Sequence, residues 1–205
     1  MNVARILYPI QVLGPGNRIG IWLCGCPHHC EGCSNPELWY TSEEYEIEEN
    51  DLISAIYSIS ESHVVDGFTF TGGEPFQQAQ SLKKIIEKIK RISTDILVYS
   101  GYTLLELKEK KDENIDFILN NVAVLIDGKY INELNSELPL RGSSNQKIWI
   151  FDADYEEKYR EIMNQPNKIQ NFMSKDGIIS VGIHKKGYNE ELKKVVKQKS
   201  ERGVL

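Results

Sequence analysis

The sequence lacks the marks of a membrane protein or a secreted protein. No apolar run approaches the roughly 18 residues that a membrane-spanning helix needs, and residues 1–20 contain no long apolar core followed by a small-residue cleavage site. An excess of positive charge is also missing, since 30 acidic and 24 basic side chains give a formal net charge of −6. This balance argues against a general nucleic-acid or anionic-membrane surface. We therefore expect a cytoplasmic protein whose partner is a small molecule or another protein.

Internal repeats and low-complexity linkers are missing as well, so nothing in the sequence marks a boundary between domains. A length of 205 residues is ordinary for one domain, and a hydrophobic content of 40% is enough for a sizeable core. We expect a single domain over residues 1–205.

Cysteine is scarce but concentrated. The four cysteines are Cys24, Cys26, Cys30 and Cys33, and the last three have the spacing C-x3-C-x2-C. Thiolate is a soft ligand that suits iron-sulfur clusters and zinc, and a reducing cytoplasm disfavours disulfides. Structural zinc sites prefer four thiolates in two well-separated pairs, whereas these four lie unusually close together. The spacing favours a cluster, with a zinc site and then disulfides as the alternatives.

Short apolar runs alternate with segments of helical periodicity along the chain. This alternation predicts βαβ units around a mainly parallel sheet. We expect strands at residues 19–23, 67–71, 96–99, 122–126, 147–151 and 178–183, and helices at residues 51–61, 82–89 and 104–107, the last with Thr103 as its N-cap.

Polar motifs follow four of these expected strands. The cysteine loop follows the first strand, residues 72–75 follow the second, Ser100 follows the third, and residues 127–129 follow the fourth. In parallel α/β folds, ligands gather at the carboxyl ends of the strands. We therefore expect these motifs to meet in one site.

The motifs resemble those of the radical S-adenosylmethionine (SAM) superfamily. Cys26, Cys30 and Cys33 match its C-x3-C-x2-C hallmark, and the GGEP at residues 72–75 matches its second motif. The loop continues through residues 34–39 as C-x-N-x3-W, which is most similar to the glycyl-radical activases, in particular the activating enzymes of anaerobic ribonucleotide reductase. The resemblance covers about residues 10–151 and implies an α/β fold with a partial (βα) TIM-type barrel, the radical SAM core.

The resemblance also implies the cofactors and where they bind. Cys26, Cys30 and Cys33 hold a [4Fe-4S] cluster, whose fourth iron is bound by the amino and carboxylate groups of SAM. Glycines permit close backbone approach, and a carboxylate can accept hydrogen bonds from the amino group. The implied SAM-binding residues are Gly32, Cys33 and Ser34; Gly72, Gly73, Glu74 and Pro75; Ser100; and Asp127 and Lys129.

Some residues keep a second interpretation. Residues 125–130 and the RGSSNQ segment at residues 141–146 resemble activase segments, and Asp127 and Lys129 resemble the D-x-K pair that contacts SAM in the related formate-lyase activases, but each segment could be a surface turn or loop. Cys24 could be a spare ligand, a redox-active thiol or a small buried residue, and it is left off the cluster because burial is the commonest fate of a free cysteine. His28 and His29 are expected to shape the cysteine loop or to face solvent. His184 lies near the end of the last expected strand, where it could approach the adenosyl group or be structural.

The implied activity is reductive cleavage of SAM to a 5'-deoxyadenosyl radical, which abstracts hydrogen from a glycine of a partner enzyme. A reduced flavodoxin or ferredoxin is the implied electron donor. Residues 152–205, with a further strand and a Lys-rich terminal helix, exceed what such an activase usually needs. Two alternatives remain: a radical SAM enzyme that modifies a small molecule, such as a nucleotide or purine, or a peptide, and a non-catalytic four-cysteine zinc or iron-sulfur module.

Overall fold

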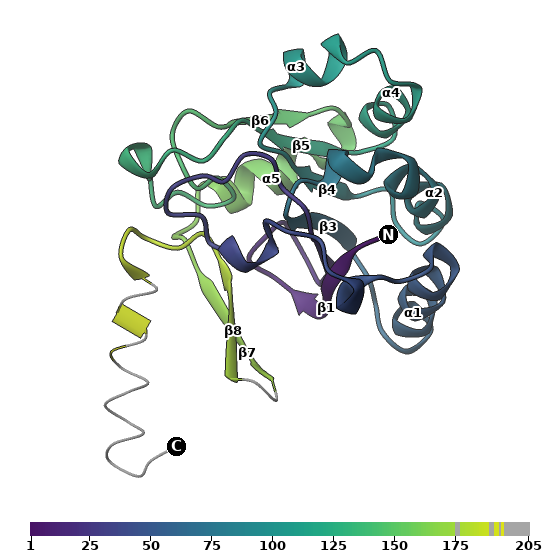
Figure 1. Cartoon of the computed structure of the whole chain (residues 1–205), viewed down its shortest axis with the longest axis horizontal. Helices are drawn as coiled ribbons and strands as arrows, with labels where there is room; N and C mark the ends of the chain where they lie inside the picture. Colours follow the sequence, from purple (N-terminus) through teal and green to yellow (C-terminus); the bar gives the residue numbers. More distant parts are fainter. Residues whose placement is uncertain (175–176, 189–190, 193, 195–205) are drawn as a thin grey trace.

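The computed structural model describes residues 1–174, 177–188, 191–192 and 194, and its centre is a six-stranded sheet (Figure 1). The strands lie in chain order across the sheet, and β2 to β5 are mutually parallel. The edge strands β1 and β6 run antiparallel to their neighbours. The bounds are β1 Val3–Ile10, β2 Arg18–Leu23, β3 Gly67–Gly72, β4 Ile96–Tyr99, β5 Val124–Asp127 and β6 Lys147–Ile150. The fold is therefore mixed α/β with a mainly parallel sheet, as predicted.

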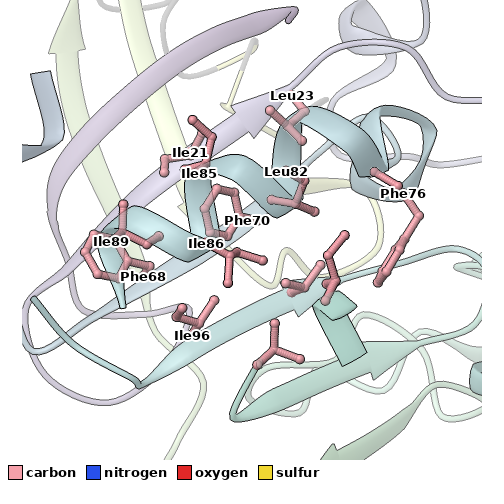
Figure 2. Close-up of a cluster of buried hydrophobic side chains, with 14 of the residues drawn as sticks. Ile21, Leu23, Phe68, Phe70, Phe76, Leu82, Ile85, Ile86, Ile89 and Ile96 are labelled. Carbon is pink, nitrogen blue, oxygen red and sulfur yellow. The ribbon is translucent and has the colours of Figure 1, made fainter. Parts of the chain in front are cut away.

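The helices between the parallel strands pack on one face of this sheet. They are α1 (Glu49–Ser62), α2 (Ala79–Ile89), α3 (Leu104–Glu109) and α4 (Glu113–Leu119). Along α2, Leu82, Ile85, Ile86 and Ile89 recur at helical spacing and are fully buried. Figure 2 shows these side chains among strand residues such as Phe70. Burial of this shared apolar face holds the helices on the sheet.

The other face is covered by the C-terminal part of the chain. Helix α5 (Glu156–Met163) packs Tyr159 against side chains of β4 and β5, including Leu97 and Val124. Strands β7 (Ile169–Ser174) and β8 (Gly177–Gly182) form a separate antiparallel hairpin, which Figure 1 shows projecting from the body. Val181 of β8 joins the apolar cluster of Ile10 and Trp22.

Short 3-10 helices occupy several connections between these elements. They are η1 Pro36–Leu38, η2 Glu43–Tyr45, η3 Pro75–Gln78, η4 Asn132–Leu134 and η5 Ala153–Tyr155. Over the part of the chain that the structure describes, none of the helices is both long enough and apolar enough to cross a membrane.

The sequence predicted most of these elements correctly, and Thr103 caps α3 in a capping box with Glu106. The strands at residues 147–151 and 178–183 were wrongly assigned to the βαβ series, because β6 runs antiparallel to β5 and β8 pairs with β7 outside the main sheet. Strand β1 was not predicted; irregular register near Val3 and between Leu7 and Ile10 interrupts its pairing with β2. The predicted Lys-rich terminal helix falls mostly outside the described residues.

A buried charged network joins the amino ends of the strands to α5. Arg18, which is fully buried, places Nη1 2.9 Å from Oδ2 of Asp95 and donates from Nε to Oγ1 of Thr69 at 2.8 Å. The hydroxyl of Tyr159 donates to Oδ1 of Asp95 at 2.7 Å. A charge can be buried only when it is paired and hydrogen-bonded. This network therefore fixes α5 to the sheet at the end opposite the carboxyl ends of the parallel strands.

We expect Asp95→Ala to lower the free energy of unfolding by about 3–5 kcal/mol, because the Arg18 guanidinium would stay buried without its partner. Tyr159→Phe, which removes only one hydrogen bond to the carboxylate, should cost about 2 kcal/mol. Equilibrium unfolding in urea measures both values. A change below about 1 kcal/mol for Asp95→Ala would be too small for a buried ion pair.

Candidate active site

A cavity of about 750 Å³ lies at the carboxyl ends of β2, β3, β4 and β5. Its lining includes residues of the cysteine loop, of the glycine-rich segment after β3, of the turn after β4 and of the segment after β5. These are the four places where the sequence analysis expected polar motifs to meet. Residues 180–188 also line the cavity.

The cysteine loop is held by backbone hydrogen bonds near its start. The N–H groups of Gly25 and Cys26 donate to the carbonyls of Leu38 and Trp39, each at 2.9 Å. Inside the loop, the N–H of Cys33 donates to the carbonyl of Cys30 at 3.1 Å and forms a turn. The side chains of Cys26, Cys30 and Cys33 are half-buried, and all three line the cavity.

Cys24 is separated from these three thiols. It is fully buried in the apolar cluster of Ile10, Trp22 and Leu38, and it does not line the cavity. Burial raises the pKa of its thiol. A four-thiolate zinc or cluster site therefore lacks its fourth ligand, and Cys24 is the small buried residue that the sequence analysis expected.

The donor set fits an iron-sulfur cluster better than a single metal ion. Within the described ranges, no three His, Cys, Asp or Glu side chains lie close enough to hold one ion, whereas zinc needs all its ligands about 2.0–2.3 Å from one centre. A cluster is larger, so thiols spaced around a cavity suit it. The N–H of Asn35 donates to Sγ of Cys33 at 3.4 Å, an interaction of the kind that tunes cluster potentials.

Two of the thiols have altered acidity. Burial raises the pKa of Cys26, while hydrogen bonds from the backbone of His28 and His29 act in the opposite direction. Burial and the neighbouring Cys33 raise the pKa of Cys30, and the backbone of Tyr130 opposes this. Metal binding requires thiolates, so cluster assembly must remove these protons.

The glycine-rich segment after β3 contacts the cysteine loop through its backbone. Strands β2 and β3 pair in register so that Leu23 lies beside Gly72. A Cβ atom on Gly72, whose φ is +102°, would lie 2.5 Å from the Leu23 carbonyl oxygen, and one on Gly73 would lie 2.5 Å from that of Gly25. The N–H of Gly73 donates to the Leu23 carbonyl at 2.7 Å. Both glycines are therefore required by close backbone approach.

Glu74 connects three of the loops. It is fully buried, and its Oε1 accepts hydrogen bonds from the N–H of Phe76 and from Oγ of Ser100, both at 3.0 Å. Its Oε2 accepts from the N–H of Gly101 at 2.7 Å and lies 3.2 Å from Nε2 of His28. His28 thus points toward the protein interior. Of its two expected roles, it shapes the cysteine loop and does not face solvent.

Three predicted site residues do not line the cavity: Pro75, Asp127 and Lys129. Pro75 is buried at the start of η3. Asp127 lies on the same face of β5 as Leu125, and Leu125 packs with the helices. Oδ2 of Asp127 accepts a hydrogen bond from the N–H of Leu104 at 2.6 Å. Lys129 is exposed. Gly128 and Tyr130 belong to the same segment but were not among the predicted SAM-binding residues, and they line the cavity instead.

The RGSSNQ segment folds around Gln146. Its Oε1 accepts from the N–H groups of Gly142 and Ser143 at 2.8 and 3.2 Å, and its Nε2 donates to the carbonyl of Gly128 at 2.9 Å. Gln146 and Gly142 line the cavity. This segment is therefore an ordered part of the site and not only a surface turn.

Several polar atoms of cavity-lining residues are buried without a hydrogen-bond partner in the described part of the chain. They are Nε1 of Trp39, the hydroxyl of Tyr99 and Nδ1 of His184. Buried polar groups in proteins are almost always satisfied by protein, water or ligand. Their concentration here, with three thiols, is typical of a site that binds a polar ligand.

Comparison with known proteins gives consistent results. The model of the 4Fe-4S single cluster domain family matches residues 12–149. The anaerobic ribonucleoside-triphosphate reductase-activating protein of Vibrio cholerae is 34% identical over 152 residues, which are 70% of this chain and 95% of the relative. The proteins of the same name from Enterobacteria phage T4 and Escherichia coli (strain K12) are 33% and 31% identical, over 73% and 69% of this chain and 94% of each relative.

The different placement of the cysteines predicts their reactivity in the cofactor-free protein. We expect iodoacetamide to alkylate Cys26, Cys30 and Cys33 in the native chain and to reach Cys24 only after unfolding, because Cys24 is fully buried. The rates at Cys26 and Cys30 should rise as the pH approaches their raised pKa values, since the thiolate is the nucleophile. Peptide mass spectrometry identifies each site. Alkylation of native Cys24 as fast as Cys33 would contradict this arrangement.

Proposed function

The chain belongs to the family of anaerobic ribonucleoside-triphosphate reductase-activating proteins, and from this premise we propose that it generates the glycyl radical of an anaerobic ribonucleotide reductase. The observation that carries the proposal is the set of three half-buried thiols in one cavity, beside the glycine-rich segment and apart from the fourth thiol. Three protein ligands leave one iron of a four-iron cluster open to a substrate.

Cys26, Cys30 and Cys33 hold the [4Fe-4S] cluster in this proposal. When bound, the cluster supplies the electron for reductive cleavage of SAM into methionine and a 5'-deoxyadenosyl radical. The protein's own contribution is binding, orientation and exclusion of side reactions. The half-buried thiols and the surrounding loops provide that shielded position.

The proposed SAM site uses the cavity-lining members of the predicted set: Gly32, Cys33, Ser34, Gly72, Gly73, Glu74 and Ser100. The carboxylate of Glu74 already accepts several hydrogen bonds from the protein, so its main role is to hold Ser100 and Gly101 in place around SAM. Pro75, Asp127 and Lys129 contribute indirectly. Asp127, for example, orients the start of α3, which follows the Ser100 turn.

For the architecture, we propose an open, partial TIM-type barrel in a single domain, with its core at residues 10–151. The strands follow chain order, and the connecting helices pack on one face, as in a singly wound barrel and unlike a doubly wound sheet. Residues 152–205 form an extension of the same domain, supported by the buried bond of Tyr159 to Asp95.

The partner in this proposal is a glycyl-radical enzyme, and a reduced flavodoxin or ferredoxin is the electron donor. The four cysteines are free thiols, which suits a reducing compartment such as the cytoplasm.

Anaerobic reconstitution with iron and sulfide tests the chemistry. We expect the reduced protein to show a [4Fe-4S] electron paramagnetic resonance signal that changes on addition of SAM, together with formation of 5'-deoxyadenosine. Cys26→Ala, Cys30→Ala and Cys33→Ala should each reduce product formation to background. Cys24→Ala is the matched control and should keep it, because Cys24 lies outside the cavity. Tight zinc binding that depends on all four cysteines, without a response to SAM, would refute the proposal.

The substrate is tested separately, with an anaerobic ribonucleoside-triphosphate reductase as the candidate partner. Incubation with the reconstituted chain, SAM and a reductant should produce a glycyl-radical signal on the reductase. A Gly→Ala change at the radical position of the reductase should abolish that signal. If SAM is cleaved but the reductase gains no radical, the chain is a radical SAM enzyme with another substrate.

A further inference from the structure

The C-terminal extension supplies a wall of the cavity that lies beyond the residues matched by the family model. The alignment with the Vibrio cholerae protein covers 95% of the relative but 70% of this chain, and the family model ends at residue 149. Residues 180–188, which line the cavity, therefore lie beyond the matched region. Any contact that they make is a property of this chain and not of the shared core.

This wall is attached to the body of the protein at several points. Val181 is 3% exposed and packs in the apolar cluster with Ile10 and Trp22. Gln170 of β7 donates from Nε2 to the carbonyl of Pro9 at 2.7 Å and accepts at Oε1 from the N–H of Gln11 at 3.0 Å. The hairpin base is therefore fixed beside the end of β1.

The cavity meets β8 at its edge. Successive residues of a strand point to opposite faces, yet Ser180, Val181 and Gly182 all line the cavity. A cavity lined by three consecutive strand residues passes the strand's backbone, here along the edge and the C-terminal end of β8, where residues 183–188 continue the lining. The β7 residues do not line it, and within the described residues β8 forms backbone hydrogen bonds only to β7. Alternate N–H and C=O groups of β8 therefore point away from β7.

A polar cluster follows this strand edge. Oγ of Ser180 lies 3.1 Å from Nε2 of His184 and 3.0 Å from the Tyr188 hydroxyl, and the two rings stack at 4.4 Å. Burial lowers the pKa of His184 and so favours the neutral ring. The carbonyl of His184 accepts from Nδ2 of Asn135 at 3.0 Å. The extension is thereby joined to the segment after β5.

Exposed apolar side chains flank this junction. Ile131, Leu134 and Leu138 are each about two-fifths exposed, at 38%, 41% and 42%. They belong to the segment that includes the cavity-lining residues Tyr130 and Asn132 and the junction residue Asn135. Several exposed apolar residues close together are typical of a protein-binding surface.

We propose that the free edge of β8 binds an extended loop of the protein substrate by strand addition, and so guides that loop into the cavity. An open strand edge recognises peptide backbone, and the exposed apolar residues of the segment that Asn135 joins to the extension favour a protein over a small molecule. The inference rests on the proposed function, since the occupant is the glycine-bearing loop of the activated enzyme. It assigns partner binding to a segment outside the shared core.

Hydrogen–deuterium exchange on the unmutated, cofactor-free chain tests strand addition directly. On adding the anaerobic ribonucleoside-triphosphate reductase, we expect amide exchange to slow by about tenfold in peptides that contain residues 178–183. Peptides from β7 should change less, because its edge does not line the cavity. If the reductase binds and the β8 peptides are not protected, the inference fails and the proposed function stands.

Matched proline variants test the same edge during catalysis. Ser180 and Asn171 form a cross-strand pair, so Ser180→Pro and Asn171→Pro disturb the hairpin alike but remove an N–H from different strands. In reconstituted protein, Ser180→Pro should raise the KM for the reductase about tenfold more than Asn171→Pro does, with kcat less affected. Ser180→Ala isolates the loss of the hydroxyl and should have a smaller effect on KM than Ser180→Pro.

The outcomes separate the two proposals. Equal KM values for the two proline variants would overturn the proposal of strand addition, while the proposed function would stand. If the wild-type chain cleaves no SAM and the reductase neither binds nor gains a radical, the proposed function fails and the inference falls with it. Thermal unfolding of both proline variants shows whether the hairpin change has affected the whole fold.

Discussion

The site depends on one buried carboxylate. Both oxygens of Glu74 are bonded to groups from elsewhere: the Ser100 hydroxyl and the Gly101 N–H after β4, and His28 in the cysteine loop. Without these donors a buried carboxylate would be costly, and without the carboxylate these donors would lose their partner. The loops after β2, β3 and β4 are therefore positioned together. The parallel strands bring the loops to one end of the sheet, and Glu74 fixes how they lie there.

Close backbone contact reinforces this arrangement. The absence of side chains at Gly72 and Gly73 lets the end of β3 lie against the carbonyls of Leu23 and Gly25, immediately before the first cluster cysteine. A larger residue at either position would push the two motifs apart. The glycines of the GGEP motif thus have a structural reason that holds before any cofactor is bound, and they place Glu74 within reach of His28.

The extension is attached to this core at separate points. It is held by apolar packing of Val181 and by the Tyr159–Asp95 bond, which lies at the end of the sheet opposite the three thiols. Such an attachment allows a new wall to form beside the cavity while the strand-end loops keep their geometry. The chemistry proposed for the core and the recognition proposed for β8 are for this reason separable, and they can be altered independently by substitution.

The sequence by itself determined the residues whose role follows from local pattern and chemical type: the alternating strands and helices, the three thiols, the glycine-rich turn and the Thr103 cap. Only the tertiary structure decided the direction in which a side chain points. Asp127 turns toward α3 because it shares a face of β5 with Leu125, and Cys24 enters an apolar cluster two residues before a cavity-lining cysteine. The sequence of β8 has the same apolar pattern as the strands of the main sheet, yet β8 lies outside that sheet and pairs with β7. Partners far apart in the sequence determine each of these outcomes, so local periodicity carries no signal for them.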